Sequence, residues 1–381
     1  MGYLALILHS HLPFVRDSGT AEILEERWLF EAITNCYIPL LDSWERLEQE
    51  GIDFKITVSL SPSLLSMLKD EHLQKKYQCY LERMIALGEK ERHKYRNEPD
   101  FASLAAGYER QAQNLLSKWE QHQGDLTSRF KRLAEKGRLE LITTCATHGY
   151  LPLMSSDEAR KAQIEVGLAT FREIFGFSPR GFWLPECGYL PGIEQFLKEQ
   201  GIQYFFVDSH GILGAKPAPR YGVYAPLACG EGIWAFGRDP ESSRQVWERR
   251  LGYPGHPDYR EFYRDVGFDE TQEYLKEFLP QNIRVDTGYK YYRITGQGDS
   301  KEIYQPEIAQ QRAAEHAAHF LQSRLHQFDR IAAWMPDRQP VVVAPYDAEL
   351  FGPWWYEGPL WLESLCRLAA EKKKIDLIIP G

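Results

Sequence analysis

Two carboxylates, Glu186 and Asp347, occupy sequence positions suited to glycoside chemistry. Glu186 lies in GFWLPECGY and Asp347 in APYDAELFG, so each follows an apolar run and a proline and has aromatic neighbours. Large apolar rings partly desolvate a carboxyl group, which raises its pKa and lets it act as an acid near neutral pH. Glycoside hydrolysis uses one carboxylate at the anomeric carbon and another to protonate the leaving oxygen. Either residue alone is better explained as a helix cap or a turn residue, but together they favour a glycosidase site.

Two short motifs offer groups that bind hydroxyls or metals. His9 and His11 are two residues apart, so their side chains point the same way from an extended chain. Asp208 and His210 repeat this spacing. Metal-dependent deacetylases and mannosidases on similar barrels use such pairs as ligands. Sugar hydroxyls are the more natural partners here, and we expect no bound metal and no cofactor.

Further residues near the ends of apolar runs are candidates for holding a sugar. His148, Arg238 and Asp239 are suited to hydroxyl groups, and Arg264 in YREFYRD is a candidate whose loop the sequence does not place. Flat indole rings pack against the C–H faces of pyranose rings. The candidate stacking residues are Trp28, Trp183, Trp354 and Trp355. For the last two, in WWYEG just after Asp347, we favour a role in the site over a role in the core.

These candidates lie at the ends of seven short apolar runs. The runs end at His11, Pro62, Tyr150, Tyr189, His210, Asp239 and Glu349. In a closed parallel α/β barrel, apolar strand bodies fill the interior and polar strand ends line the active site. Long helix-favouring stretches separate the runs. The sequence therefore predicts an α/β barrel enzyme with its chemistry on one rim.

The intervening segments predict helices and an insertion. Apolar periodicity predicts helices over 21–50, 156–176, 192–200, 305–327 and 359–373. We expect 1–74 and 136–381 to form the barrel and the charged stretch 75–135 to form an inserted helical subdomain. The Gly- and Pro-rich stretch 211–231 predicts a mobile rim loop, and 248–300 predicts a loop system over the active-site face.

Composition excludes several classes of protein. The net charge of −9 argues against a nucleic-acid partner, which would require a basic face. No apolar run approaches the roughly 20 residues of a membrane span. The six cysteines form no CxxC pair, and Met1 is followed at once by the first predicted strand. These features favour a cytoplasmic protein with free thiols that binds neither membrane nor nucleic acid.

Seven segments, in order along nearly the whole chain, resemble motifs of glycoside hydrolase family 57, and they are most similar to its 1,4-α-glucan branching enzymes. They are HSHLPFVR, WLFEAI, CATHGYLP, GFWLPECGY, VDSHG, FGRDPESSRQVW and APYDAELFGPWWYEGP. The resemblance implies an incomplete (β/α)7 barrel and a retaining double displacement on an α-1,4-glucan such as amylose or glycogen, without cofactor or metal. It implies that Glu186 is the nucleophile and Asp347 the general acid/base. The implied cleft residues are His9, His11, Trp28, His148, Trp183, Asp208, His210 and Asp239.

Two departures from the family pattern bear on activity. FGPWWYEGP has Pro353 where relatives usually carry His, which removes a hydrogen-bond donor close to Asp347. Relatives also continue into a helical C-terminal domain, whereas this chain ends at Gly381, so we expect that domain to be absent or truncated. Its loss would weaken acceptor binding and shift activity toward slow hydrolysis.

The favoured function is branching, in which an oligoglucan carried by Glu186 is transferred to a 6-hydroxyl of another chain. An α-amylase or a 4-α-glucanotransferase would use the same two carboxylates, and sequence alone does not separate these activities. A truncated α-glucan-binding relative without turnover is a third reading. A metal-dependent enzyme of the deacetylase or mannosidase kind is a fourth.

Overall fold

Seven parallel strands form the centre of the computed structural model, which describes residues 2–19, 22–230, 232–248, 252–296 and 298–381. Neighbouring strands pair in the order β7-β5-β4-β3-β2-β1-β8, so each predicted apolar run supplies one strand. The strands are β1 (Gly2–Ser10), β2 (Ile56–Leu60), β3 (Leu139–Thr144), β4 (Gly181–Trp183), β5 (Tyr204–Val207), β7 (Trp234–Gly237) and β8 (Val341–Asp347).

The two ends of this sheet approach each other, as expected for an incomplete barrel. The backbone N–H of Asp239, just after β7, donates to the carbonyl of Val343 in β8 at 2.8 Å. No β7–β8 ladder is formed by the described residues. Instead, the short antiparallel strand β6 (Leu227–Ala228) pairs with β7. The predicted α/β class and incomplete barrel are thus confirmed.

The barrel interior is filled by inward-facing side chains of different strands. Ile7, Ile142, Phe206 and Val343 belong to one buried apolar cluster. At the amino ends of the strands, β9 (Ile375–Leu377) pairs with the first residues of β1. The residue after β9, Ile378, packs against the same cluster. The interior is therefore a packed core, and the candidate site residues lie at the carboxyl ends of the strands, where parallel α/β barrels carry their chemistry.

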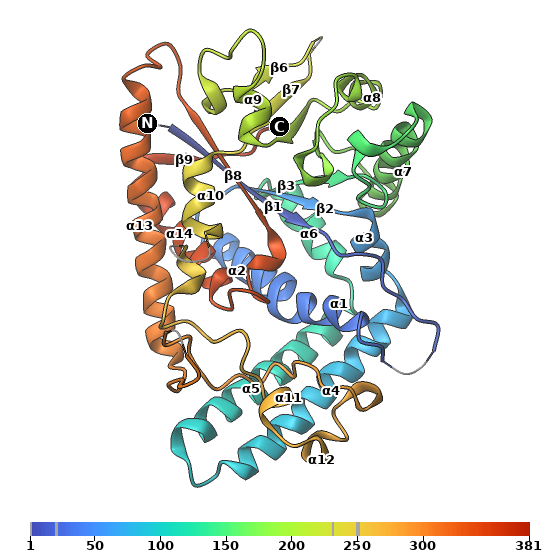
Figure 1. Ribbon diagram of the computed structural model, residues 1–381, viewed down its shortest axis with the longest axis vertical. Coiled ribbons are helices and arrows are strands. Elements are labelled where there is room, and N and C mark those ends of the chain that lie inside the picture. The colour runs from blue at the N-terminus through green and yellow to red at the C-terminus, as the bar shows by residue number, and fades with distance from the viewer. Residues whose placement is uncertain (1, 20–21, 231, 249–251, 297) are drawn as a thin grey trace.

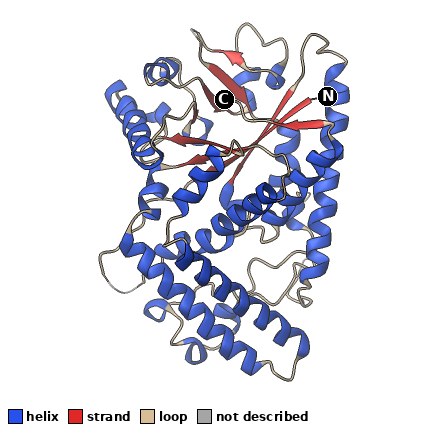
Figure 2. Ribbon diagram, turned by 180° about the vertical axis from the view of Figure 1, so that it is seen from behind, coloured by secondary structure: helices blue, strands red, loops and turns tan. Residues whose placement is uncertain are grey.

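Helices cover the outside of the sheet (Figures 1 and 2). The predicted helix over 21–50 begins at Glu26 and contains one π-helical turn, and the other predicted helices are confirmed within a few residues. None of the described helices has the length and apolar character that a membrane span requires. The helices are α1 (Glu26–Ala32), α2 (Ile38–Gln49), α3 (Pro62–Leu68), α4 (Glu71–Lys94), α5 (Pro99–Gln121), α6 (Leu126–Glu135), α7 (Asp157–Phe175), α8 (Ile193–Glu199), α9 (Ser209–Leu213), α10 (Pro240–Trp247), α11 (Val266–Asp269), α12 (Gln272–Leu275), α13 (Pro306–Ala332) and α14 (Gly358–Lys372).

The segment 75–135 contains most of α4 and all of α5 and α6. Helices α4 and α5 pack side by side in the lower part of Figure 1. Leu81 of α4 and Tyr108 of α5 belong to the same buried cluster as Leu41 of α2 and Val58 of β2. The helix pair therefore shares the main core, and its treatment as a separate subdomain stays a prediction.

The long segment before α13 packs largely against the helix pair, although the sequence suggested that it covers the active-site face. The hydroxyl of Tyr289 donates to the carbonyl of Met84 at 2.7 Å, and that of Tyr291 donates to Glu91 at 2.9 Å. Two residues of the predicted rim loop over 211–231 form strand β6. Residues 231, 249–251 and 297 of these two segments lie outside the described residues.

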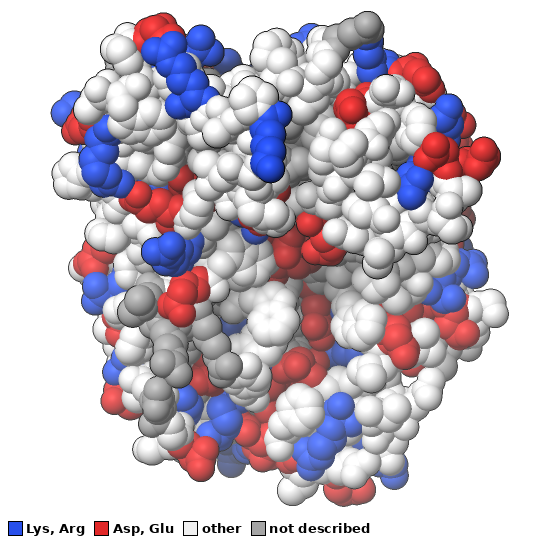
Figure 3. Space-filling view, turned by 45° about the horizontal axis from the view of Figure 1, so that its top comes forward, with Lys and Arg blue, Asp and Glu red and all other residues white. Residues whose placement is uncertain are grey.

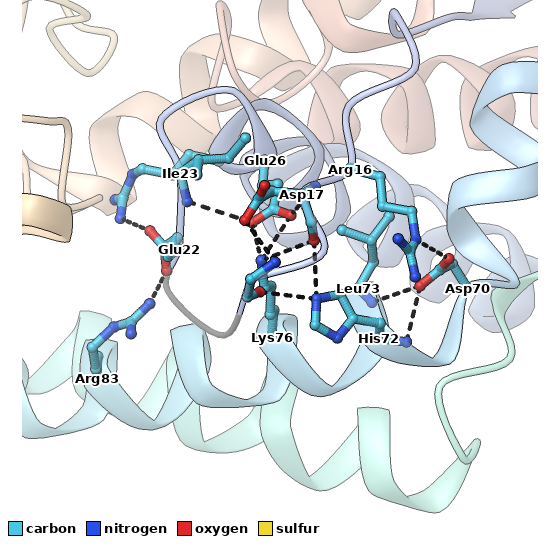
Figure 4. Close-up of polar contacts among 12 residues, drawn as sticks. Arg16, Asp17, Glu22, Ile23, Glu26, Asp70, His72, Leu73, Lys76 and Arg83 are labelled. Atoms are coloured by element: carbon cyan, nitrogen blue, oxygen red, sulfur yellow. Dashed lines mark hydrogen bonds and ion pairs between the residues drawn. The ribbon is translucent and has the colours of Figure 1, made fainter.

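Ion pairs tie the segment after β1 to α4 (Figure 4). Arg16 contacts Asp70 at 2.7 Å, and the buried ammonium of Lys76 contacts both carboxylate oxygens of Glu26 at 2.9 Å. Glu22 accepts from Arg27 at 2.6 Å. Because buried charges are costly unless paired, this network fixes the position of α1, which carries Trp28.

Candidate active site

The predicted site residues meet at the carboxyl ends of the strands. In the register of β1 and β8, His9 lies opposite Asp347. Asp208 directly follows β5, and Arg238 directly follows β7. Glu186 lies three residues after the end of β4. In a parallel barrel these ends share one rim, and the structure brings together residues that are far apart in sequence.

Three histidines form a stack in this mouth. The ring centroids of His11 and His148 are 4.0 Å apart, those of His9 and His148 4.8 Å, and His9 stacks on Trp183 at 4.7 Å. Burial lowers the pKa of His148 to about 3 and that of His11 to about 4. Burial, followed by the two neighbouring imidazoles, also lowers the pKa of His9 well below its usual value. All three rings are therefore neutral at pH 7.

Neutral imidazoles both donate and accept hydrogen bonds, as sugar hydroxyls do. Nδ1 of His9 lies 3.0 Å from the hydroxyl of Ser59, while its buried Nε2 has no partner among the described residues. A buried polar atom without a partner is costly, so Nε2 is suited to a substrate hydroxyl. Trp183 is buried beneath His9 and supports it, so its ring does not present a free stacking face.

Glu186 lies on a backbone turn of unusual conformation. Its φ is 53°, and that of Cys187 is 54°, both in the left-handed region that non-glycine residues rarely adopt. Such conformations cluster at functional sites because the surrounding structure must hold them. The turn leaves the side chain of Glu186 78% exposed, with Oε1 3.8 Å from Nε2 of His148. The expectation that aromatic rings desolvate Glu186 is therefore wrong.

Asp347 is the last residue of β8 and is exposed, although enough protein lies near its carboxyl for burial to affect its pKa. Burial raises the pKa of Asp347, the carboxylate of Glu186 raises it further, and Arg238 opposes both. The predicted direction is thus confirmed for this residue.

Arg238 is the cation of this rim. Its Nε lies 3.9 Å from Oδ2 of Asp208, and its Nη2 lies 3.9 Å from the sulfur of Cys187. Burial alone would raise the pKa of Asp208, but the hydroxyl of Ser209, Arg238 and His210 together lower it. Nδ1 of His210 is 3.2 Å from Oδ1 of Asp208, and the rest of its ring faces solvent. The charge of Arg238 therefore favours the ionised forms of both Asp208 and Asp347.

Replacing Arg238 with methionine is expected to shift the alkaline limb of kcat/KM to higher pH. The guanidinium stabilises the ionised form of Asp347, so its removal raises the pKa of that carboxyl. The protonated acid then persists to higher pH. A pH profile on a maltooligosaccharide measures the shift, with Arg238→Lys as the charge-retaining control. A limb that stays in place or moves down in the methionine variant contradicts this assignment.

Two predicted site residues are instead buried structural groups. Asp239 has no exposed surface. Its Oδ2 caps α10 by accepting from the N–H of Ser242 at 2.7 Å, and its Oδ1 accepts from Gln327 at 2.8 Å. The guanidinium of Arg324 lies 3.4 Å from Oδ2. Trp355 is 1% exposed and packs in the core. Neither side chain reaches the mouth, which corrects the expectation that they bind sugar.

Three aromatic and basic candidates remain, namely Trp28, Trp354 and Arg264. Trp28 on α1 and Trp354 are both largely exposed, and Trp354 stacks on Phe262 at 4.5 Å with nearly parallel rings. Arg264 pairs with Asp269 at 2.8 Å and covers the ring of Tyr292, so its guanidinium is engaged within its own segment. Its placement gives no support for a role in sugar binding.

Sequence reasoning missed Glu349, two residues after Asp347. Its carboxyl accepts a hydrogen bond from the hydroxyl of Tyr37 and another from the backbone N–H of His11. Burial, reinforced by Asp347, raises the pKa of Glu349 to about 8. It is therefore mostly protonated at pH 7 and joins the first strand to the last. No dependable sequence signal was available, because Glu349 lies in a 3-10 turn, Ala348–Leu350, that follows β8 and not in the strand itself.

Acidic side chains gather in the hollow at the centre of the face drawn in Figure 3. Such a surface suits a neutral ligand rather than an anionic one. Among the described residues, no cluster of three or more His, Cys, Asp or Glu side chains has the arrangement of a metal site. The mouth therefore offers carboxylates and neutral imidazoles. Together with the barrel, this set defines a protein of the glycoside hydrolase class.

The chain belongs to glycosyl hydrolase family 57, whose profile matches residues 5–381. The crystal structure of an alpha-amylase from Thermotoga maritima is 42% identical, with a TM-score of 0.95 over 100% of this chain and 73% of that one. A GH57-type branching enzyme from Pyrococcus horikoshii is 36% identical, with a TM-score of 0.87 over 99% of this chain and 68% of that one.

A 1,4-alpha-glucan branching enzyme of Thermococcus kodakarensis is 36% identical over 404 residues. The match covers 97% of this chain and 56% of that enzyme, so this chain spans little more than half of its length.

Proposed function

We propose that this chain is a retaining α-1,4-glucan-acting enzyme, with Glu186 as nucleophile and Asp347 as general acid/base. The observation that carries the proposal is that the two carboxyls lie at one rim. Asp347 lies opposite His9 in the register of β8 and β1. The ring of His9 stacks on that of His148 at 4.8 Å, and Glu186 lies 3.8 Å from His148. A retaining glycosidase requires one ionised and one protonated carboxyl beside the scissile bond. The named activities of the family relatives support a glucan substrate.

In the first step, the carboxylate of Glu186 attacks the anomeric carbon and forms a C1–O bond. The glycosidic C1–O bond breaks, and protonated Asp347 gives its proton to the leaving oxygen. The products are a released glucan with a free hydroxyl and a β-linked glucosyl ester on Glu186. The side chain of Glu186 is exposed and its Oε1 lies 3.8 Å from Nε2 of His148, which leaves its oxygens free to attack.

In the second step, Asp347 acts as a base instead of an acid. Once Glu186 is esterified it carries no charge, so it no longer raises the pKa of Asp347, and the ionised form of that group is favoured. Asp347 then removes a proton from an acceptor hydroxyl, whose oxygen attacks C1 and releases Glu186. The anomeric configuration is retained after two inversions. The same pair therefore serves as acid first and base second.

The acceptor decides the reaction, and we favour the 6-hydroxyl of a second glucan, which gives branching. Transfer to a sugar in preference to water requires that the acceptor be held in position. The exposed rings of Trp28, on α1, and of Trp354, seven residues after Asp347, offer faces for this. Hydrolysis as in an α-amylase is the second candidate, favoured by the likeness to the Thermotoga maritima structure.

Product analysis on amylose separates these reactions. Branching is expected to produce new α-1,6 anomeric signals in proton NMR with few new reducing ends. An α-amylase produces reducing ends without α-1,6 linkages, and a 4-α-glucanotransferase redistributes chain lengths while producing neither. No product from any α-glucan, with binding retained, would instead support a non-catalytic glucan-binding protein. Deacetylation of an acetylated sugar would overturn the assignment altogether.

A further inference from the structure

A second cavity, of about 450 Å³, lies between α5 and the beginning of α13. It is found in the lower part of Figure 1, where the start of α13 approaches the helix pair. Its volume falls within the range of about 300–1,000 Å³ typical of small-molecule sites. None of the residues that form the candidate active site lines it.

The floor of this cavity is made of three tyrosine rings whose hydroxyl groups are fixed. The hydroxyl of Tyr108 donates to the carbonyl of Lys290 at 2.6 Å, that of Tyr304 to Glu357 at 2.7 Å, and that of Tyr356 to Gln111 at 2.6 Å. These bonds join α5, the segment before α13 and the residues just before α14, so the floor is rigid. A preformed floor spares a ligand the cost of ordering it.

The floor is further supported from behind. The guanidinium of Arg260 is buried and lies 3.5 Å from the centroid of the Tyr356 ring. The backbone N–H of Arg260 donates to Glu357 at 3.1 Å, and that carboxylate also holds Tyr304. One cation and one carboxylate thus fix two of the three rings. Aromatic faces held in this way pack well on sugar rings.

The rim of the cavity carries polar side chains that make no hydrogen bond or ion pair with any described residue. They are Asp100, Ser103, Arg110, Gln305 and Glu307. Carboxylates accept hydrogen bonds, the guanidinium donates them, and the hydroxyl and amide do both. A sugar hydroxyl also donates and accepts, so it can use every group on this rim. Two carboxylates and one guanidinium give no positive field that would select an anion.

We propose that this cavity is a second α-glucan-binding site, which holds the polysaccharide while another part of it is processed in the barrel mouth. The inference rests on the proposed function, because it assumes a glucan polymer as substrate. Its ligand is a short run of neutral glucosyl units packed on the partly exposed ring of Tyr356, with hydroxyls bound by the rim. A polymer bound at two places gains a high local concentration at the catalytic site.

One short segment, which begins four residues after Asp347, contributes Tyr356 to the wall of this cavity. Its exposed Trp354 stacks on Phe262, and Trp355, between Trp354 and Tyr356, is buried in the core. The segment between Phe351 and Trp355 is held in a tight turn, in which the N–H of Gly352 donates to the carbonyl of Trp355. Only nine positions therefore separate Asp347 from a residue of the cavity wall.

Filling the cavity with Ser103→Trp tests the proposal. The ratio of kcat/KM on glycogen to kcat/KM on maltoheptaose is expected to fall by about 10-fold, because only a polymer engages both sites. The control is Ser117→Trp, the same change at an exposed position of α5 that does not line the cavity. It lies 14 residues further on, about 21 Å along the helix. An unchanged ratio in Ser103→Trp overturns the proposal.

Equilibrium dialysis of maltoheptaose provides a readout that needs no turnover. The Glu186→Gln variant is expected to bind two molecules per chain, and Glu186→Gln with Ser103→Trp is expected to bind one. Arg110→Ala, which removes a donor without adding bulk, is expected to weaken the second site. A stoichiometry of one in the first variant rejects the cavity as a glucan site. Two bound molecules with no turnover by the parent chain would reject the proposed function while upholding this site.

Discussion

Replacing Glu186 with alanine is expected to lower kcat on α-glucans by about 10⁴- to 10⁶-fold, the range seen when a covalent nucleophile is removed. Without this carboxylate, no glucosyl-enzyme forms and water must attack an unactivated anomeric carbon. The fold should survive, because the side chain is 78% exposed and its nearest polar neighbour, His148, is 3.8 Å away. Initial rates, together with the midpoint of urea unfolding, measure the two effects separately.

Azide distinguishes a lost nucleophile from any other cause of inactivity. With α-glucosyl fluoride as substrate, azide can enter the space vacated in Glu186→Ala and displace fluoride in a single step. The expected product is the β-glucosyl azide, with inverted configuration. In Asp347→Ala the glucosyl-enzyme still forms and azide attacks it from the other face, giving the α-azide. An α-azide from the Glu186 variant would exchange the two assignments, and the same inverted product from both would reject the double displacement.

Much of the site could be predicted because parallel strands share a direction. Seven apolar runs with polar ends specify where His9, Asp208, Arg238 and Asp347 must meet, even though 338 positions separate the first from the last. This inference needs only the strand pattern and the closure of the sheet. It does not depend on the conformation of loops. Predictions were less successful for residues whose side-chain position depends on the loop that follows a strand.

Asp239 shows how a local signal can compete with a positional one. It ends an apolar run, which suggested a place on the rim. However, Asp followed by Pro and Glu is also the typical beginning of a helix, and the structure uses it in this way to start α10. The ion pair with Arg324, 85 positions away, was not predictable from local sequence. The burial of this pair explains why the carboxylate is unavailable to substrate.

Glu186 illustrates the opposite error. Its aromatic neighbours in sequence suggested an apolar pocket, but the turn at φ 53° carries its side chain away from them. Trp183, three residues earlier, points into the barrel and is buried. Sequence proximity to large rings therefore did not mean contact with them. A left-handed conformation at a non-glycine residue has no dependable sequence signature, so this feature required the structure.

The same limitation applies to the paired tryptophans of WWYEG, and it leads to a strong test. Trp355→Ala is expected to reduce the free energy of unfolding by about 3–5 kcal/mol, since it empties a buried site among Tyr253, Phe351 and Trp361. Trp354→Ala is expected to change stability by less than about 1 kcal/mol, because its side chain is largely exposed. Urea unfolding, with the slope held common, measures both values.

For activity the order of the two effects should be reversed, with the larger change in Trp354→Ala. Because the exposed ring of Trp354 is proposed to hold the acceptor, its removal is expected to raise KM for glucan in protein that remains folded. Trp355 is buried in the core, so Trp355→Ala should retain the KM of the parent below its unfolding transition. Equal destabilisation by the two changes would show that the turn at Gly352 does not hold these rings as described. Gly352 has φ 130°, and a Cβ at this position would lie 1.8 Å from the carbonyl oxygen of Asn35. Only glycine can therefore occupy this position of the turn. The turn at Gly352 thus sets the directions of both rings, so that Trp354 is exposed and Trp355 is buried in the core.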